Sequence, residues 1–423
     1  LLNNQRLPKP YLKELLNLVK KYQCLGLNVA HSGTLVGLLL SREQLENLPQ
    51  LEAELARSAS GAYYQTRTLS RIIFEGVQPV REETDKLQEG RRYCDQLGKP
   101  PGSLGKLETI YARLHAMFSG PIDLEKKIVL VYVADNGIVA EGVSANPQET
   151  TYTVARNILA GKSGLCAISK HVGSDICLVD IGCKKDIFEE NKDKVCHGTR
   201  NMLKEQAMTR EQAIAAILVG YKKTEALIKD GYRLFGTGEM GIGNTTTSAA
   251  VIAAVLGLKA EDVTGYGAGL TQDMKAHKTA VIQQCLDCHA PYGDILDLTA
   301  KLGGLDMLAM AGTHLVCARY QLPCVVDGLI SLTGLLIAHQ LTPHVLDYTF
   351  ASHASTEPAY RLVSDFLGLE PMLLLDMRLG EGSGCPLAFF LLENAVYTME
   401  HMPTFAEGSL KEEDYVDIRK NVT

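Results

Sequence analysis

A run of glycines in front of an apolar helix could bind an anion. Residues 235–257, FGTGEMGIGNTTTSAAVIAAVLG, read as the end of a strand, a Gly-rich loop and a helix of Ala, Val and Ile that Asn244, Thr245 and Thr246 would cap. Glycines let backbone N–H groups approach a phosphate, and the helix N-terminus adds favourable partial charge. The pattern favours an anion site, and glycines that serve packing alone are the alternative.

A second glycine cluster lies close behind the first in sequence. The segment GYGAG, residues 265–269, precedes LTQDMKAHK, which places Lys275 and Lys278 in the first turns of another helix. Lys278 could reach a phosphate held by the glycines, whereas a lone lysine is usually a solvated surface residue. Two Gly-rich loops beside one lysine therefore predict a phosphate pocket.

An acidic residue stands between glycines near the end of the chain. Glu381 lies within RLGEGSG, residues 378–384, which follows a predicted strand. A carboxylate at a Gly-flanked strand end can be partly desolvated, which raises its pKa and makes it a general base near neutral pH. A solvated loop glutamate is the alternative.

Two other motifs compete with this interpretation. Gly236, Gly238 and Gly241 match the G-x-G-x-x-G dinucleotide fingerprint, with Glu261 about twenty residues further on. Glu261, however, leads into another glycine cluster instead of closing a second strand, so a nicotinamide-dependent dehydrogenase is the weaker hypothesis. The C-x-x-C-H match at 285–289 has no second Cys pair to complete a zinc site, and we predict no metal site.

Alternating strands and helices must position these residues. From Lys99 onward the predicted strands are KIVLVYVAD (127–135), SDICLVDIG (174–182), YRLFGTGEMG (232–241), LPCVVDG (322–328) and PMLLLDMRLG (371–380). Helical stretches separate them, which indicates βαβ units and a mostly parallel sheet with flanking helices. Ligands bind outside the carboxyl ends of such strands, where residues 135–137, 236–243, 327–328 and 380–382 should meet.

Composition limits the classes of protein that this chain can be. It has 423 residues, of which 46% are hydrophobic, and its net charge of −7 argues against nucleic-acid binding. No segment approaches the roughly 18 apolar residues of a membrane span. Eleven scattered cysteines are typical of reduced thiols in a cytoplasmic protein.

The N-terminal residues do not follow the pattern of alternating strands and helices that begins at Lys99. We expect a helix at 9–22, a strand–turn–strand pattern in GLNVAHSGTLVGLLL (26–40), and a charged connection at 78–92 that enters a new helix. Because the chain starts with LLNNQ, we expect it to be a piece of a longer protein.

Six motifs in the second part of the chain carry a family resemblance: KPPGSLGKLE from Lys99, ADNGIVAEGVSANPQETT from Ala134, GEMGIGNTTT from Gly238, VVDG at 325–328, HASTEP from His353 and MRLGEGSG from Met377. Through these motifs, from about residue 80 to its end, the chain resembles the family of nicotinate-nucleotide:dimethylbenzimidazole phosphoribosyltransferases.

The resemblance implies roles for particular residues. Glu381 is expected to remove the ring proton of the incoming base, with Glu239 as the second catalytic carboxylate. The phosphoribosyl site is expected to comprise Gly241, Gly243, Gly267, Lys278, Asp327, Ser355 and Gly384. The aromatic base is expected beside Ser144, Gln148, Met240 and Leu379. Ala140 stands where the family often has a polar contact to the base.

The resemblance also implies a Rossmann-like domain with a smaller helical domain, a homodimer, and small-molecule substrates with no cofactor. The expected reaction transfers the phosphoribosyl group of nicotinate mononucleotide to a benzimidazole-type base. It needs groups that bind the phosphate, groups that stabilise positive charge on the ribose, and a general base, but no metal. A mononucleotide-binding module without catalysis is the alternative.

The N-terminal segment resembles a different family. GLNVAHSGTLVGLLL is similar to the C-terminal part of GHMP-type kinases, especially the threonine kinase of cobalamin synthesis, although the phosphate loop of such kinases is missing. We therefore expect residues 1–70 to be a partial kinase-like segment and residues 71–423 to be the transferase domain, with a packing extension as the alternative for the first part.

Overall fold

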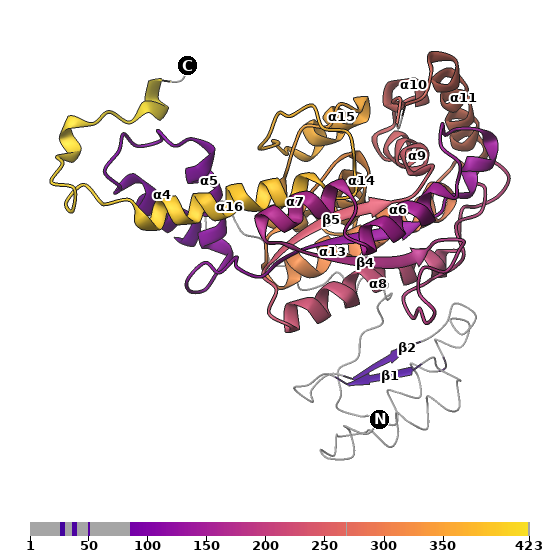
Figure 1. Ribbon diagram of the computed structural model, residues 1–423, viewed down its shortest axis with the longest axis horizontal. Coiled ribbons are helices and arrows are strands. Elements are labelled where there is room, and N and C mark those ends of the chain that lie inside the picture. The colour runs from indigo at the N-terminus through magenta and orange to yellow at the C-terminus, as the bar shows by residue number, and fades with distance from the viewer. Residues whose placement is uncertain (1–25, 30–35, 40–49, 51–84, 268, 422–423) are drawn as a thin grey trace. The chain divides into compact units, whose positions relative to one another are not determined.

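The computed structural model describes residues 26–29, 36–39, 50, 85–267 and 269–421 (Figure 1). The chain divides into two units, residues 1–75 and 76–423. In the first unit, β1 (Gly26–Val29) pairs antiparallel with β2 (Val36–Leu39). The two strands predicted there are confirmed, whereas the helix predicted at 9–22 lies outside the described residues.

A five-stranded parallel sheet forms the centre of the second unit. Its order is β4-β3-β5-β6-β7. The strands are β3 (Lys127–Ala134), β4 (Asp175–Gly182), β5 (Leu234–Met240), β6 (Cys324–Val326) and β7 (Thr349–Ala351). From β3 the chain continues to β4 on one side, and β5 and the later strands lie on the other side of β3. The crevice between two such strands, here β3 and β5, is the usual ligand site of an open α/β sheet. The predicted parallel sheet is confirmed.

Helices cover both faces of this sheet (Figure 1). They are α6 (Thr150–Leu159), α7 (Gly164–Val172), α8 (Arg210–Lys229), α9 (Asn244–Leu256), α10 (Ala260–Val263), α11 (Gln272–His289), α12 (Ile295–Leu302), α13 (Leu305–Arg319), α14 (Leu329–Leu341), α15 (Pro358–Leu367) and α16 (Gly384–His401). Helix α13 packs on β3, β4 and β5 with α8 against it, and α6, α7 and α16 lie on the opposite face. Every residue of β3 is buried, as expected for a strand covered on both sides.

A smaller group of helices lies at one end of this unit (Figure 1). Helices α4 (Asp85–Asp95) and α5 (Lys106–Met117) pack together, and α5 also packs on α16. The Tyr93 hydroxyl donates to the Met399 carbonyl at 3.3 Å, and the ring of Tyr93 stacks on Tyr111. This group corresponds to the expected smaller helical part.

Short 3₁₀ turns complete the described elements. They are η3 (Gly137–Glu141), η4 (Pro343–Tyr348), η5 (Glu412–Asp414) and η6 (Ile418–Asn421). The guanidinium of Arg113, on α5, donates to three carbonyl oxygens at the end of η4, those of Leu346, Asp347 and Thr349, at 2.7–3.1 Å. Arg113 thereby ties the helical group to the β7 edge of the sheet.

One predicted strand is wrong. Residues 371–380 form no strand, and only Leu373 makes an isolated parallel bridge, to His353. The neighbouring strand β7 has three residues, so it offers too few backbone partners for a longer pairing, and the side chains of Leu374 and Leu375 are exposed. Glu381 therefore follows an irregular segment, and the fifth strand is the shorter β7, which we did not predict.

Candidate active site

The Gly380–Gly384 turn packs directly on β5. A Cβ atom added to Gly238 would lie 2.7 Å from the carbonyl carbon of Glu381, and one added to Gly236 would lie 2.6 Å from Cβ of Cys385. Both glycines lie inside the strand and not in a loop. A glycine within a strand commonly marks such a close backbone approach. The first half of the predicted Gly-rich loop thus serves to bring Glu381 to the end of β5.

Glu381 has an unusual backbone conformation. Its φ is 63°, in the left-handed region that residues other than glycine rarely adopt. One carboxylate oxygen, Oε2, is buried and has no hydrogen-bond partner within the described residues. Residues held in rare conformations cluster at functional sites, and here the strain aims an unsatisfied carboxylate at the end of the sheet.

A single amide joins two buried carboxyl groups beside this turn. The side-chain Nδ2 of Asn244 donates to Oε2 of Glu239 and, at 3.1 Å, to Oδ2 of Asp306. Burial raises the pKa of Glu239 to about 8, and the negative charges of Asp306, Asp327 and Glu381 contribute to the rise. Burial also raises the pKa of Asp306, to about 6. Burial and the neighbouring negative charges therefore favour the protonated form of Glu239 in the free protein.

Asp327 supports the Glu381 turn from the end of β6. Its two carboxylate oxygens accept the backbone N–H groups of Gly384, at 2.7 Å, and Gly382, at 3.1 Å. Burial raises the pKa of Asp327 to about 7, although these hydrogen bonds oppose the shift. Nδ1 of His353 lies 3.7 Å from Asp327, and burial lowers the pKa of His353. Asp327 and Gly384, predicted to bind the phosphoribosyl group, therefore bind each other.

Helix α9 begins differently from the prediction. Gly243, with φ of 91°, occupies the N-cap position, and the side chain of Asn244 binds carboxyl groups instead of capping the helix. Gly241 follows β5 and lies against the end of β3. A Cβ atom there would overlap the carbonyl oxygen of Ala134, the last residue of β3, and would lie 3.2 Å from Oδ2 of Asp306. The Gly241–Gly243 turn thus meets the end of β3, as expected for two strand ends at the carboxyl edge of the sheet.

Three of the predicted phosphoribosyl residues lie near one another, close to Thr245 in the first turn of α9. Nζ of Lys278 is buried and donates to Oγ1 of Thr245 at 2.8 Å. The same lysine Nζ lies 3.7 Å from the position of a Cβ on Gly267. Glu357 accepts the N–H of Gly267 at 2.9 Å, and its own N–H donates to Ser355. Gly267, Lys278 and Ser355 thus belong to one contact network.

The four predicted base-binding residues are more scattered. Gln148 donates to the carbonyl of Asn136, just beyond β3, at 3.3 Å. Met240 packs against the cluster of Val133, Ala155, Cys183 and Ile187. Oγ of Ser144 accepts the N–H of Asn146. Leu379 lies instead against Gly164, at the start of α7, and its side chain is 59% exposed.

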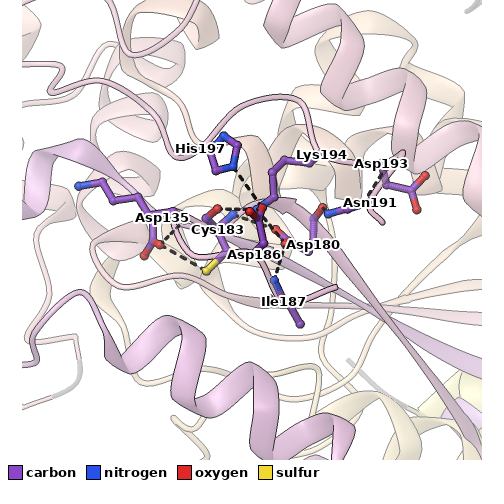
Figure 2. Close-up of polar contacts among 10 residues, drawn as sticks. Asp135, Asp180, Cys183, Asp186, Ile187, Asn191, Asp193, Lys194 and His197 are labelled. Atoms are coloured by element: carbon purple, nitrogen blue, oxygen red, sulfur yellow. Dashed lines mark hydrogen bonds and ion pairs between the residues drawn. The ribbon is translucent and has the colours of Figure 1, made fainter. Parts of the chain in front are cut away.

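A polar network holds the segment that follows β4 (Figure 2). Buried Asp180 accepts the N–H groups of Cys183, at 2.9 Å, and Ile187, at 3.3 Å, and forms an ion pair with Lys194 at 3.0 Å. Lys194 also binds Asp186, which contacts His197.

The same segment reaches the residues beyond β3. Asp135 accepts the N–H of Lys184 at 2.8 Å, and Nζ of Lys184 donates to Oε1 of Gln148 at 2.7 Å. The network therefore connects the segment after β4 to a predicted base-binding residue.

Sequence reasoning missed Asn244 as a carboxyl ligand, as well as Asp306, Glu357 and Lys184. Asp306 follows Gly303-Gly304 at the start of α13 and looks like an ordinary first-turn acid. Glu357 stands in the quoted HASTEP motif, which was the available clue. The contacts of both residues are made to segments more than 60 positions away.

The competing motifs do not gather a site of their own. Glu261 lies in α10 with an exposed side chain, and not at a strand end, so the dinucleotide fingerprint is incomplete. Cys285 is buried and Cys288 exposed on α11, and His289 binds the carbonyl of Met202. Among the described residues, no group of three or more His, Cys, Asp and Glu side chains could hold a metal ion. No helix in the described part of the chain has the length and hydropathy to span a membrane.

Comparisons with known proteins agree on one family. A family model described as phosphoribosyltransferase matches residues 78–410. The nicotinate-nucleotide–dimethylbenzimidazole phosphoribosyltransferase of Clostridium tetani is 42% identical over 350 residues, which are 81% of this chain and 96% of the relative. The enzyme of the same name from Geotalea uraniireducens is 43% identical over 346 residues, 80% of this chain and 97% of the relative.

Solved structures give the same result. The crystal structure of CobT from Thermus thermophilus superposes with a TM-score of 0.75 at 37% identity, covering 78% of this chain and 99% of that one. Sequence, fold and family model therefore coincide over the second unit. The chain belongs to the family of nicotinate-nucleotide–dimethylbenzimidazole phosphoribosyltransferases.

Proposed function

We propose that this chain transfers the phosphoribosyl group of nicotinate mononucleotide to 5,6-dimethylbenzimidazole or a related base, which gives α-ribazole 5′-phosphate and nicotinate for assembly of the cobalamin nucleotide loop. The family and the arrangement of carboxylates around the end of β5 support this proposal. The observation that carries it is the buried Oε2 of Glu381, which has no partner within the described residues.

The chemistry explains why the site is built from carboxylates and glycines. The bond between the ribose C1′ and the pyridinium nitrogen breaks, and its electron pair neutralises the departing nicotinate ring. A ring nitrogen of the incoming base forms the new bond to C1′ from the opposite face, which turns a β-nucleotide into an α-product. The second ring nitrogen of the base then loses its proton to Glu381, acting as the general base.

Glu239 is suited to stabilise the positive charge that develops on the ribose. It lies beside the Glu381 turn, since a Cβ on Gly380 would lie 2.8 Å from Oε1 of Glu239. The charged groups that act on Glu239 are all negative, so a cationic substrate would favour its ionised form. Once ionised, the Glu239 carboxylate would stabilise the positive charge of the transition state.

Lys278 and the glycine turns are suited to bind the 5′-phosphate. Burial lowers the pKa of Lys278 to about 8, and a bound phosphate would restore the ordinary preference for the ammonium form. In this arrangement Gly241, Gly243, Gly267 and Ser355 line the phosphoribosyl site, while Asp327 and Gly384 hold the turn of Glu381. Ser144, Gln148, Met240 and Leu379 are proposed to contact the base.

We further infer a cytoplasmic homodimer, on the strength of the family resemblance. Residues 71–423 are assigned to the transferase domain, and residues 1–70 to a segment similar to the C-terminal part of a GHMP-type kinase. That segment lacks a phosphate loop of its own, so we assign it no independent phosphorylation.

The test is direct. Purified chain is mixed with nicotinate mononucleotide and a panel of bases, and release of nicotinate is followed by chromatography. Nicotinate release that depends on the base, with an α-linked product, is the expected result. Binding of the nucleotide with no turnover on any benzimidazole, purine or phenol would contradict the proposal and favour a non-catalytic binding module.

A further inference from the structure

Glu357 already occupies part of the proposed phosphate site. It is the N-cap residue of α15, yet its side chain makes no capping hydrogen bond to its own helix. Instead, Oε1 accepts the backbone N–H of Gly267 at 2.9 Å, across 90 residues of sequence. That N–H is one of the groups expected to hold the substrate phosphate.

The neighbouring backbone is shaped to admit this carboxylate. A Cβ added to Gly265 would lie 2.6 Å from the carboxyl carbon of Glu357 and would overlap its oxygen. Any side chain at position 265 would therefore exclude Glu357 from its present place. The absence of a side chain there lets the carboxylate reach Gly267.

Glu357 also supplies the negative charge for a buried lysine. Lys278 has 1% of its surface exposed, and its Nζ makes its hydrogen bond to a neutral hydroxyl, Oγ1 of Thr245. Glu357 is the acidic residue whose charge favours the ammonium form of Lys278. A buried cation is costly without a nearby anion, so the carboxylate supplies part of the compensation that a phosphate would give.

The carboxylate is nevertheless poorly satisfied. Its second oxygen, Oε2, is buried without a hydrogen-bond partner in the described structure. A buried acceptor without a partner is unfavourable, so a ligand that makes more hydrogen bonds can displace this arrangement. A phosphate with three acceptor oxygens could take both the Gly267 N–H and the Lys278 ammonium.

We propose that Glu357 is a specificity-determining residue, an internal carboxylate that takes the place of the substrate phosphate at Gly267 and Lys278 until a complete nucleotide displaces it. This inference rests on the proposed phosphate site. Free inorganic phosphate must displace Glu357 with its own contacts alone, whereas a nucleotide adds the contacts of its ribose and pyridinium ring. Glu357 thus discriminates against small anions.

The experiment compares the binding of inorganic phosphate to the wild-type chain and to Glu357→Gln by calorimetry, together with its inhibition of nicotinate release. Removal of a negative charge from the phosphate site should tighten phosphate binding by at least about tenfold. The Michaelis constant for nicotinate mononucleotide should fall by less, so selectivity for the nucleotide is reduced. Glu261→Gln is the matched control, because it removes an exposed charge from nearby α10 and should change neither constant.

Two further variants complete the test. Lys278→Met in the Glu357→Gln background should abolish the gain in phosphate affinity, which locates the effect at this site. Glu357→Asp keeps the charge but is one methylene shorter, so it should release Gly267 and give an intermediate affinity; it serves if Glu357→Gln does not fold.

The possible failures are distinguishable. Equal or weaker phosphate binding by Glu357→Gln, with the wild-type chain active, would show that Glu357 only holds the glycine turn and would overturn the inference. A wild-type chain that neither binds nor turns over nicotinate mononucleotide would instead contradict the proposed function.

Discussion

Gly238 lies against the backbone of Glu381, with room for no side chain between them: a Cβ on Gly238 would lie 2.7 Å from the Glu381 carbonyl carbon and overlap its oxygen. Two motifs separated by more than 140 residues are therefore in direct backbone contact, which is possible because residue 238 has no Cβ atom. The contact places Glu381 beside Glu239, the next residue of β5.

The first prediction concerns this contact. Gly238→Ala should push the Glu381 turn away from β5, because the obstructing atoms belong to backbone and not to a flexible side chain. We expect a loss of about 1–3 kcal/mol in the free energy of unfolding, which is typical of overpacking. We also expect a large loss of turnover in the molecules that remain folded, because the Glu381 turn is displaced. Urea unfolding and nicotinate release measure the two effects. Retention of full turnover would mean that the turn does not need this position.

The second prediction tests the general base. Glu381→Gln keeps the size of the side chain but cannot accept the ring proton, so turnover should fall by about 10²–10⁴ while nucleotide binding stays nearly unchanged. Glu370→Gln is the control, since Glu370 is exposed and pairs with Lys106 at the surface. Unchanged turnover in Glu381→Gln would remove Glu381 from this role.

The third prediction concerns pH. Burial and the charge of Asp306 both raise the pKa of Glu239, to about 8, so the ionised form becomes abundant only above that pH in the free protein. Asp306→Asn removes one negative neighbour and should lower the pKa of Glu239. The acid limb of the kcat/KM profile, which reports the free protein, should therefore move to lower pH.

If Asp306→Asn lost turnover while the acid limb of its kcat/KM profile stayed in place, Asp306 would act only on packing. Asp297→Asn provides a comparison, because Asp297 is partly exposed and binds Lys301 and Gly293 instead of the carboxyl cluster. It should leave the acid limb in place.

The sequence was sufficient for features that depend on local pattern. Short apolar runs predicted β3, β4, β5 and β6. The glycines around Glu381 singled out that residue, whereas the role expected of Glu239 came from the family resemblance. Residues 371–380 misled for the same reason, since MLLLDM has the composition of a buried strand, but its neighbour β7 is too short to pair with it.

The remaining features depend on contacts between distant segments. Asn244 looks like a helix cap, Asp306 like a first-turn acid and Glu357 like an N-terminal helix residue, and each was open to a local explanation. Their actual partners lie on other elements: Asn244 joins Glu239 to Asp306, and Glu357 reaches Gly267. These partners meet through the packing of elements that are distant in sequence, which no local pattern reveals.

The fourth prediction is that transfer needs no metal ion. The leaving group of nicotinate mononucleotide is a pyridinium that becomes neutral as it departs, so no diphosphate charge has to be neutralised by a cation. Activity should be unchanged after dialysis against a chelator, and added magnesium should have no effect on nicotinate release. Loss of activity on chelation, with recovery on addition of magnesium, would contradict this.

The fifth prediction concerns the segment after β4. Asp180 is buried and accepts two backbone N–H groups there, in addition to its ion pair with Lys194. Asp180→Asn should cost about 2–4 kcal/mol of unfolding free energy, because Lys194 is left with the exposed carboxylate of Asp186 and the amide cannot accept every one of these bonds. Asp186→Asn removes the exposed partner of the same lysine and should lower the free energy of unfolding much less than Asp180→Asn does.

The same pair of variants separates stability from function. The segment carries Lys184, whose ammonium binds Gln148, a residue proposed to contact the incoming base. Loosening the segment should therefore raise the Michaelis constant for the base in Asp180→Asn more than that for nicotinate mononucleotide, whose proposed phosphate contacts, at Gly267 and Lys278, belong to other segments of the chain. Steady-state kinetics with each substrate varied in turn give both constants. An equal rise in both would mean that the network supports the sheet as a whole and not the base site in particular.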